Sequence, residues 1–160
     1  MTSTPRLRRL EADAAALASA FTNHAHVTIV PVGDAPYEAY RFVYRLRGVR
    51  LDSRGQPAWS DHHSVLLRLG PGYPRERPFA IMETPIFHPN ISVRIGEEVT
   101  FTDQWSAAQS IVDIVVAIGE LIQYQRYSGL SPLNPVAARW AAENASAFPV
   151  GHVRLLEAPT

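Results

Sequence analysis

The spacing of apolar side chains changes after about residue 23, and this change divides the chain into a helical and a strand-forming part. Up to that point they recur every three or four residues, which predicts an amphipathic helix that begins at Thr4 and Pro5. Beyond it the spacing falls to two, which predicts antiparallel strands that each bury one face. Four strands are expected, over residues 26–30, 40–47, 64–69 and 79–82, and residues 48–61 are expected to form a loop.

The second half of the chain predicts two helices after a long irregular segment. Residues 84–109 have no regular period, and such a segment in a compact domain often carries function. Ser110 and Asp113 form a capping box that begins one helix, and Asn134 caps another. The order of one helix, a four-stranded antiparallel meander, an irregular segment and two helices predicts an α+β sandwich.

The length and composition fit a single domain, which we assign to residues 1–148, followed by a tail at 149–160. The formal net charge is zero, so neither nucleic acid nor an acidic membrane surface is an expected partner. The chain has no cysteine, which excludes disulfides, thiolate metal sites and thioester chemistry. No apolar run reaches the roughly 20 residues of a membrane helix, so we expect a cytoplasmic protein.

Four short motifs, in this order, are specific to one protein family. They are Tyr73-Pro74 with Pro78, the segment TPIFHPNI at 84–91 that contains His88, Pro89 and Asn90, the pair Trp105-Ser106, and PLNP at 132–135. Their sequence and order over about residues 6–148 resemble the YPxxxP, HPN, WS and PLNP segments of ubiquitin-conjugating enzymes. This resemblance implies the ubiquitin-conjugating (UBC) fold.

The resemblance also implies where a nucleophile would lie. In the family a cysteine accepts ubiquitin as a thioester, three residues after a loop glycine and about eight before the tryptophan. Counted from Gly96 the position is Val99, and counted back from Trp105 it is Glu97. Neither side chain can form a thioester. The resemblance therefore implies a noncatalytic member, similar to the ubiquitin-conjugating-enzyme variants, that binds a ubiquitin-like protein or a conjugation-pathway enzyme.

Without an acyl-enzyme to stabilise, Asn90 is expected to serve the structure rather than catalysis. We expect the HPN segment to close a tight turn in which His88 bonds the backbone. Val99 should be at least half buried and close to that turn, because an apolar side chain gains by packing. His62 and His63 are adjacent on a strand and face opposite sides, so we expect no metal site there and no cofactor.

Two surfaces are candidates for partner binding, and the oligomeric state is not predicted. The first is the outer face of the sheet, with Arg41, Val43, Arg45, Leu66 and Arg68. The second is the start of the first helix, whose three arginines are expected to face water: Arg6, Arg8 and Arg9. In the resembling enzymes the corresponding helix meets the activating enzyme. Since no thioester is received here, the sheet face is preferred.

Two alternatives stay open at the level of sequence. An enzyme could use the same cleft for chemistry that needs no thioester, with Glu97, Glu98, His88 and Asn90 as its polar groups. An RWD-type interaction domain shares the fold and the YPxxxP turn. It usually lacks the HPN segment and the PLNP helix start, which are both present here.

Overall fold

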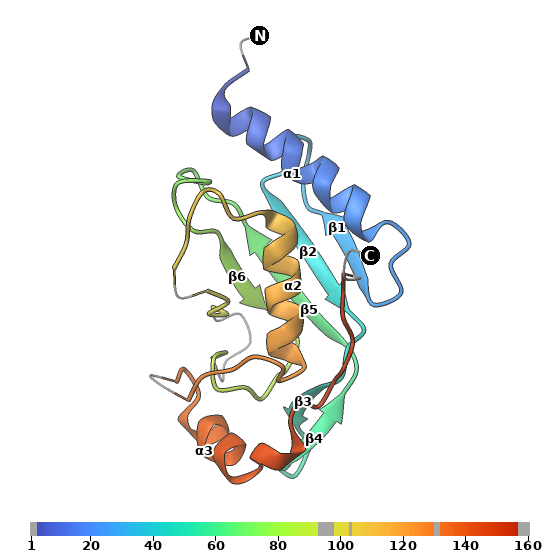
Figure 1. Ribbon diagram of the computed structural model, residues 1–160, viewed down its shortest axis with the longest axis vertical. Coiled ribbons are helices and arrows are strands. Elements are labelled where there is room, and N and C mark those ends of the chain that lie inside the picture. Colours follow the sequence, from blue (N-terminus) through green and yellow to red (C-terminus); the bar gives the residue numbers. More distant parts are fainter. Residues whose placement is uncertain (1–2, 93–97, 103, 130–131, 157–160) are drawn as a thin grey trace.

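The computed structural model describes residues 3–92, 98–102, 104–129 and 132–156. The helices are α1 (Pro5–Phe21), α2 (Ile111–Ile122) and α3 (Pro135–Glu143), followed by a short 3-10 turn, η1 (Ala145–Ala147). The strands are β1 (Val27–Pro31), β2 (Ala39–Tyr44), β3 (Gly48–Leu51), β4 (Pro57–Ser60), β5 (His63–Arg68) and β6 (Phe79–Met82). Helices α1 and α2 lie over the same face of the main sheet, and α3 lies at the far end from α1 (Figure 1).

Helix α1 begins and packs as its sequence predicts. The Thr4 hydroxyl accepts the N–H of Leu7 at 3.0 Å, and Pro5 occupies the first helical position. Leu10, Leu17 and Phe21, which share one face at helical spacing, are buried. This apolar stripe attaches α1 to the sheet.

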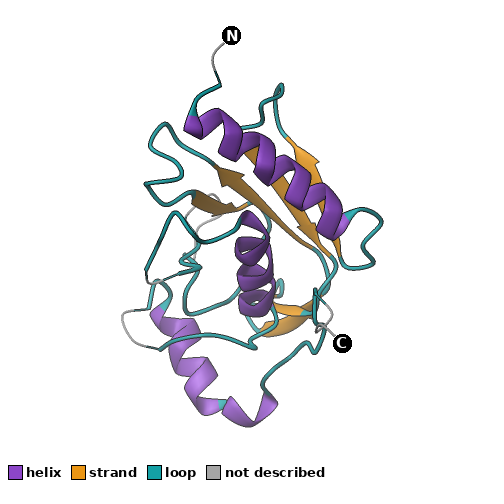
Figure 2. Cartoon of the chain, turned by 45° about the horizontal axis from the view of Figure 1, so that its top comes forward, coloured by secondary structure: helices purple, strands orange, loops and turns teal. Residues whose placement is uncertain are grey.

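The main sheet is antiparallel, with the order β1-β2-β5-β6. Tyr40, Phe42 and Tyr44 alternate along β2 and are buried beneath the helices, as the period of two predicts. The Tyr44 hydroxyl donates to the carbonyl of Val115 on α2 at 2.8 Å, so the buried phenol is satisfied. The sheet and α1–α2 therefore form two layers, which Figure 2 shows from a second direction.

The expectation of a loop at 48–61 is wrong, because this segment forms the hairpin β3–β4. Val49 pairs with Trp59, and the turn between the strands is closed by Asp52. Its carboxylate accepts the N–H of Arg54 at 2.8 Å and that of Gln56 at 3.0 Å. Gly55 and Pro57 made the segment resemble a loop, although they belong to the turn and to the start of a short strand.

The residues after α3 pack on the domain as far as they are described. The N–H of Val153 donates to the side chain of Gln123 at 2.8 Å, and the carbonyl of Leu155 accepts from the His24 ring at 2.6 Å. Leu155 is buried against Gly119, where a Cβ would lie 2.5 Å from its side chain. Residues 149–156 therefore contribute to the core. None of the described helices is long and apolar enough to cross a membrane.

Candidate functional site

Val99 lies beside the HPN turn, as the alignment with the family predicts. Its N–H donates to the carbonyl of Ala80 on β6 at 2.8 Å, and Val99 forms an isolated antiparallel bridge with Ile91. The N–H of the next residue, Thr100, donates to the carbonyl of Asn90 at 3.2 Å. For Val99 and Thr100, the prediction that this segment adjoins the turn is confirmed. Glu97, the other position considered for a nucleophile, lies outside the described residues.

The side chain of Val99 is 0% exposed, which confirms the expected burial. It belongs to the main core, together with Ile91 and Met82. A large acyl partner cannot reach a fully buried side chain, since reacting atoms must approach to about 3–3.5 Å. At this position the chain therefore carries a side chain that packs in the core, and not an accessible nucleophile.

His88 is part of the interior of the HPN turn. Its Nδ1 accepts the N–H of Asn90 at 3.0 Å, and its ring lies 4.6 Å from that of Tyr124. Burial lowers the pKa of His88 to about 3, and the backbone of Leu121 and Arg126 offsets this only in part. Among the described residues its Nε2 has no hydrogen bond of ordinary geometry. His88 is therefore neutral near pH 7 and not exposed for proton transfer.

The side chain of Asn90 makes two reciprocal bonds to one residue of the loop after α2. Its Nδ2 donates to the carbonyl of Ser128 at 3.0 Å, and its Oδ1 accepts the N–H of Ser128 at 2.8 Å. The carbonyl of Pro89 accepts the N–H of Leu133 at 2.8 Å and that of Asn134 at 3.2 Å. The HPN turn thus joins the loop after α2 to the start of α3. This geometry supports a structural role for Asn90.

A second core, rich in aromatic residues, packs against the HPN turn. The Tyr124 hydroxyl donates to the carbonyl of Phe87 at 2.5 Å, and the Tyr124 ring stacks on Phe148 at 4.5 Å. Trp140 of α3 makes ring contacts with Phe87, Tyr124 and Phe148. Because Asn134 also caps α3, the PLNP segment and the HPN turn stabilise one another.

Of the polar groups named for the alternative chemistry, the three that the structure describes do not form an acid–base pair. Glu98 is paired with Arg77 at 3.0 Å, His88 is buried, and the amide of Asn90 bonds Ser128. Within the described ranges no three metal-ligating side chains gather at one point. Trp105, a family landmark, donates its indole N–H to the carbonyl of Pro74 at 2.8 Å, which fixes the YPxxxP turn against the irregular segment.

The start of α1 is not the free basic surface that its sequence suggests. The guanidinium of Arg9 pairs with Asp13 at 2.9 Å and donates to the carbonyls of Ala107 and Gln109 at 2.5 and 2.6 Å. Arg6 pairs with Glu38 at 2.9 Å and donates to the carbonyl of Gly70 at 2.9 Å. The expectation that these arginines face water is wrong for both. Arg8 is exposed.

Asp13 is a buried charged residue whose contacts the sequence did not reveal. Its side chain lies on the buried face of α1 with a residue exposure of 4%, and it accepts the Tyr73 hydroxyl at 2.5 Å. Arg9 also lies over the Tyr73 ring, 5.2 Å from its centre. The network Arg9–Asp13–Tyr73 therefore connects α1 to the YPxxxP turn. The sequence did contain one sign of this network: Asp13 is a charged residue one helical turn from the buried Leu10 and Leu17, on the same face of α1.

The outer face of the sheet brings together most of the predicted partner-binding residues. The strand register places Arg41 between Val30 and Leu66, and Val43 between Thr28 and Ser64. Arg68 lies between Ala39 and Phe79. The same face carries further apolar side chains that the sequence analysis did not select: Val30 at 39% exposure, Phe79 at 51%, and the half-buried Ile81. Neither view shows a described helix on this face (Figures 1 and 2).

The arginines of this face differ in their partners. Arg41 forms a two-point pair with Glu83 at 2.6 and 3.0 Å, which holds the pKa of the Glu83 carboxyl below its usual value. Arg45 lies beyond the end of β2 and donates to Thr28 and to the carbonyls of His24 and Ala25. Arg45 therefore stabilises the segment that leads into β1 and does not lie at the centre of the outer face.

Comparisons with known proteins agree with the fold. The family model described as ubiquitin-conjugating enzyme matches residues 55–152. A domain of a Toxoplasma gondii ubiquitin-conjugating enzyme superposes with a TM-score of 0.61 at 21% identity, covering 89% of this chain and 91% of that one. A Plasmodium yoelii protein assigned to the same class gives 0.64 at 18% identity, covering 94% and 92%. These low identities show the fold alone. No curated protein sequence matches the chain significantly.

Proposed function

The chain belongs to the ubiquitin-conjugating enzyme family, and we propose that it is a noncatalytic member that binds a ubiquitin-like protein or another component of a conjugation pathway. The observation that carries this proposal is the burial of Val99, at 0% exposure, in a chain without cysteine. The engagement of Asn90 with Ser128 supports it, because the amide that could approach an oxyanion serves the loop instead.

The outer sheet face is the surface that we propose for binding. Val43 and Leu66 form its partly exposed apolar centre, and Val30 and Phe79 extend it toward the two edges. Charged side chains surround this centre, with Arg41 paired to Glu83 and with Arg68 exposed. An apolar centre with a polar rim is the usual composition of a binding interface.

Replacing Val43 with aspartate is expected to weaken partner binding by at least about tenfold. The substitution places an unpaired carboxylate in the apolar centre, where a bound partner would exclude water from it. The fold should persist, because Val43 is on the face away from the helices. Titration with ubiquitin and with purified activating and conjugating enzymes measures the effect, with circular dichroism to verify folding.

Arg8→Glu is the matched control for this experiment. Arg8 is exposed at the start of α1, so its charge reversal should change binding by less than about twofold if the sheet is the interface. A larger loss from Arg8→Glu than from Val43→Asp would move the proposed interface to the helix. The variant pair therefore distinguishes the two candidate surfaces.

The RWD-type alternative is less well supported than UBC-type binding. The HPN and PLNP segments are both present, and they are joined by the bonds from Leu133 and Asn134 to the carbonyl of Pro89. These bonds make the two segments one structural unit. We therefore interpret the chain as a UBC domain in which the position of the catalytic cysteine is modified.

A further inference from the structure

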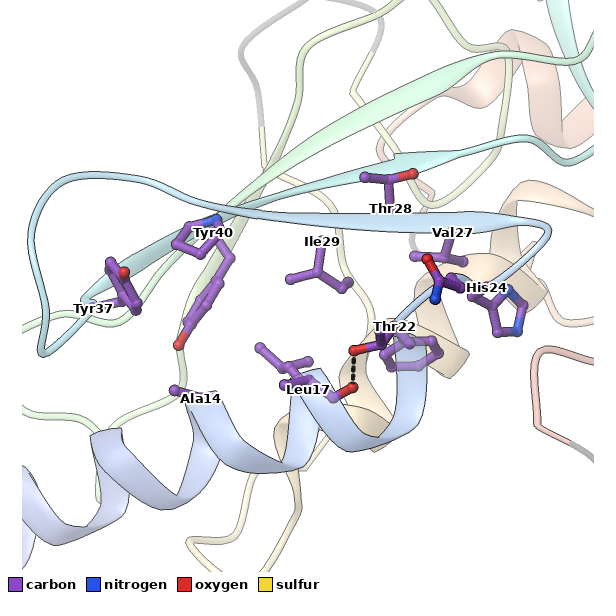
Figure 3. Close-up of a pocket in the computed structure, with 13 residues that line it drawn as sticks. Ala14, Leu17, Thr22, His24, Val27, Thr28, Ile29, Tyr37 and Tyr40 are labelled. Atoms are coloured by element: carbon purple, nitrogen blue, oxygen red, sulfur yellow. Dashed lines mark hydrogen bonds between the residues drawn. The ribbon is translucent and has the colours of Figure 1, made fainter.

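A groove of about 450 Å³ opens between α1 and β1, on the opposite side of the sheet from Val43. Figure 3 looks into it and shows Leu17 and Ile29 facing one another from the helix and the strand. Its walls are mainly apolar and include Ala14, Leu17, Ala18, Phe21, Val27, Ile29, Pro31, Tyr37 and Tyr40. This volume lies within the range of protein binding pockets.

The groove lies along an edge of the sheet that has unused backbone groups. Strand β1 pairs with β2 alone. The carbonyl of His26 accepts from Arg45 at 2.8 Å, and the N–H of Val32 donates to Ala39 at 3.0 Å, so alternate residues from 26 to 32 face β2. The N–H and C=O groups of Val27 and Ile29 therefore point away from the sheet. No hydrogen bond joins them to any part of the chain that the structure describes.

We propose that this edge binds an extended segment of a protein partner, which adds as a fifth strand beside β1. The backbone of Val27 and Ile29 would bond the added strand, and its inward side chains, at alternate positions, would enter the groove beside α1. The groove favours uncharged apolar side chains of the ligand, since none of its lining residues is Asp, Glu, Lys or Arg. The ring of His24, which also lines the groove, already bonds Leu155 and His26.

Two features of the sequence determine what fits. Ala14 and Ala18 are one helical turn apart and leave open the space that a larger side chain would fill. Pro31 has no N–H, so it ends the row of edge donors after Ile29. The ligand is therefore a short strand. Because this site lies on the other side of the sheet from the proposed Val43 surface, both could be occupied together.

The probe for this site is a fluorescein-labelled peptide of alternating valine and threonine, blocked at both ends. Wild-type protein should bind it saturably in fluorescence anisotropy. The amide signals of Val27 and Ile29 should shift and become protected from exchange. Ile29→Pro removes one outward N–H but no bond of the β1–β2 ladder, so the fold should persist while binding falls at least about fivefold. Unfolding curves of each variant verify that it is folded.

A second variant tests the groove without touching the strand. Ala18→Leu fills the space beside β1 and should weaken peptide binding about tenfold, whereas Ala15→Leu, exposed on the same helix, should not. Val43→Asp should also leave peptide binding unchanged, which separates this site from the proposed interface. Wild-type affinity in both Ile29→Pro and Ala18→Leu would overturn the proposal.

A peptide that is N-methylated at every second residue tests the backbone bonds directly. It keeps its side chains but cannot donate to β1, so it should lose most of its affinity. Equal binding of the methylated peptide would show that the groove takes side chains without strand addition. Self-association of the protein that Ile29→Pro abolishes would identify a second copy of the chain as the occupant. Either outcome would contradict the proposed partner segment.

Discussion

Replacing Arg9 with alanine is expected to lower the free energy of unfolding by about 3 kcal/mol. Arg9 is the ion-pair partner of Asp13, whose residue exposure is 4%. Without it the carboxylate stays buried and retains only its bond from the Tyr73 hydroxyl. The carbonyls of Ala107 and Gln109 also lose their donors. An exposed ion pair would contribute only about 0–1 kcal/mol, so the predicted effect depends on burial.

Urea denaturation followed by tryptophan fluorescence measures the loss, and Arg8→Ala is its neighbouring control. Arg8 is exposed and should cost less than about 0.5 kcal/mol. Asp13→Asn removes the charge but not the shape, so the double variant Arg9→Ala/Asp13→Asn should recover part of the stability. If Arg9→Ala were as mild as Arg8→Ala, the buried network could not be what holds α1 to the YPxxxP turn.

Acid is expected to destabilise the protein well above the pH at which carboxylates titrate. His88 has its pKa lowered by burial from 6.5 to about 3, so between these values the unfolded state binds a proton that the folded state does not. Stability is therefore unaffected above pH 6.5 and falls by up to about 1.4 kcal/mol for each pH unit below it. At pH 5.0 the loss from His88 amounts to about 2 kcal/mol. Burial also lowers the pKa of His63, which acts in the same direction.

The variant His88→Asn tests the origin of this slope. The amide oxygen of asparagine can accept the N–H of Asn90 in place of Nδ1 but cannot be protonated in this range. Unfolding free energies measured from pH 7.5 to 5.0 should show a shallower slope in His88→Asn, whatever its stability at pH 7.5. Equal slopes in wild type and His88→Asn would show that His88 is not the sensor.

Local patterns in the sequence were sufficient to predict most of the framework. The period of two placed Tyr40, Phe42 and Tyr44 correctly because β2 buries one face along its whole length. The capping box of Ser110 and Asp113 marked the start of α2, since both of its bonds are made within one turn. Such features depend on neighbours in the chain, and the sequence reports neighbours directly.

Contacts between distant segments were not predictable in this way. The burial of Asp13 was not predicted from the sequence, because its partner Tyr73 lies 60 positions away. Leu155 packs on Gly119 from a segment without regular secondary structure. Its burial therefore could not be predicted from a regular spacing of apolar residues. The same limit applied at the candidate site. Alignment predicted that Val99 lies beside the HPN turn, but only the fold revealed that Asn90 is bonded to Ser128.

The most direct test of a noncatalytic role is an attempt to charge the protein. Wild type and Val99→Cys would be incubated with ATP, ubiquitin and a ubiquitin-activating enzyme, then examined by intact mass spectrometry and size-exclusion chromatography. We expect no covalent adduct on either chain, because residue 99 is fully buried, and a noncovalent complex with a pathway protein. A covalent adduct on the wild-type chain would show that it is an enzyme, and ready charging of Val99→Cys would show that the site had lost only its nucleophile.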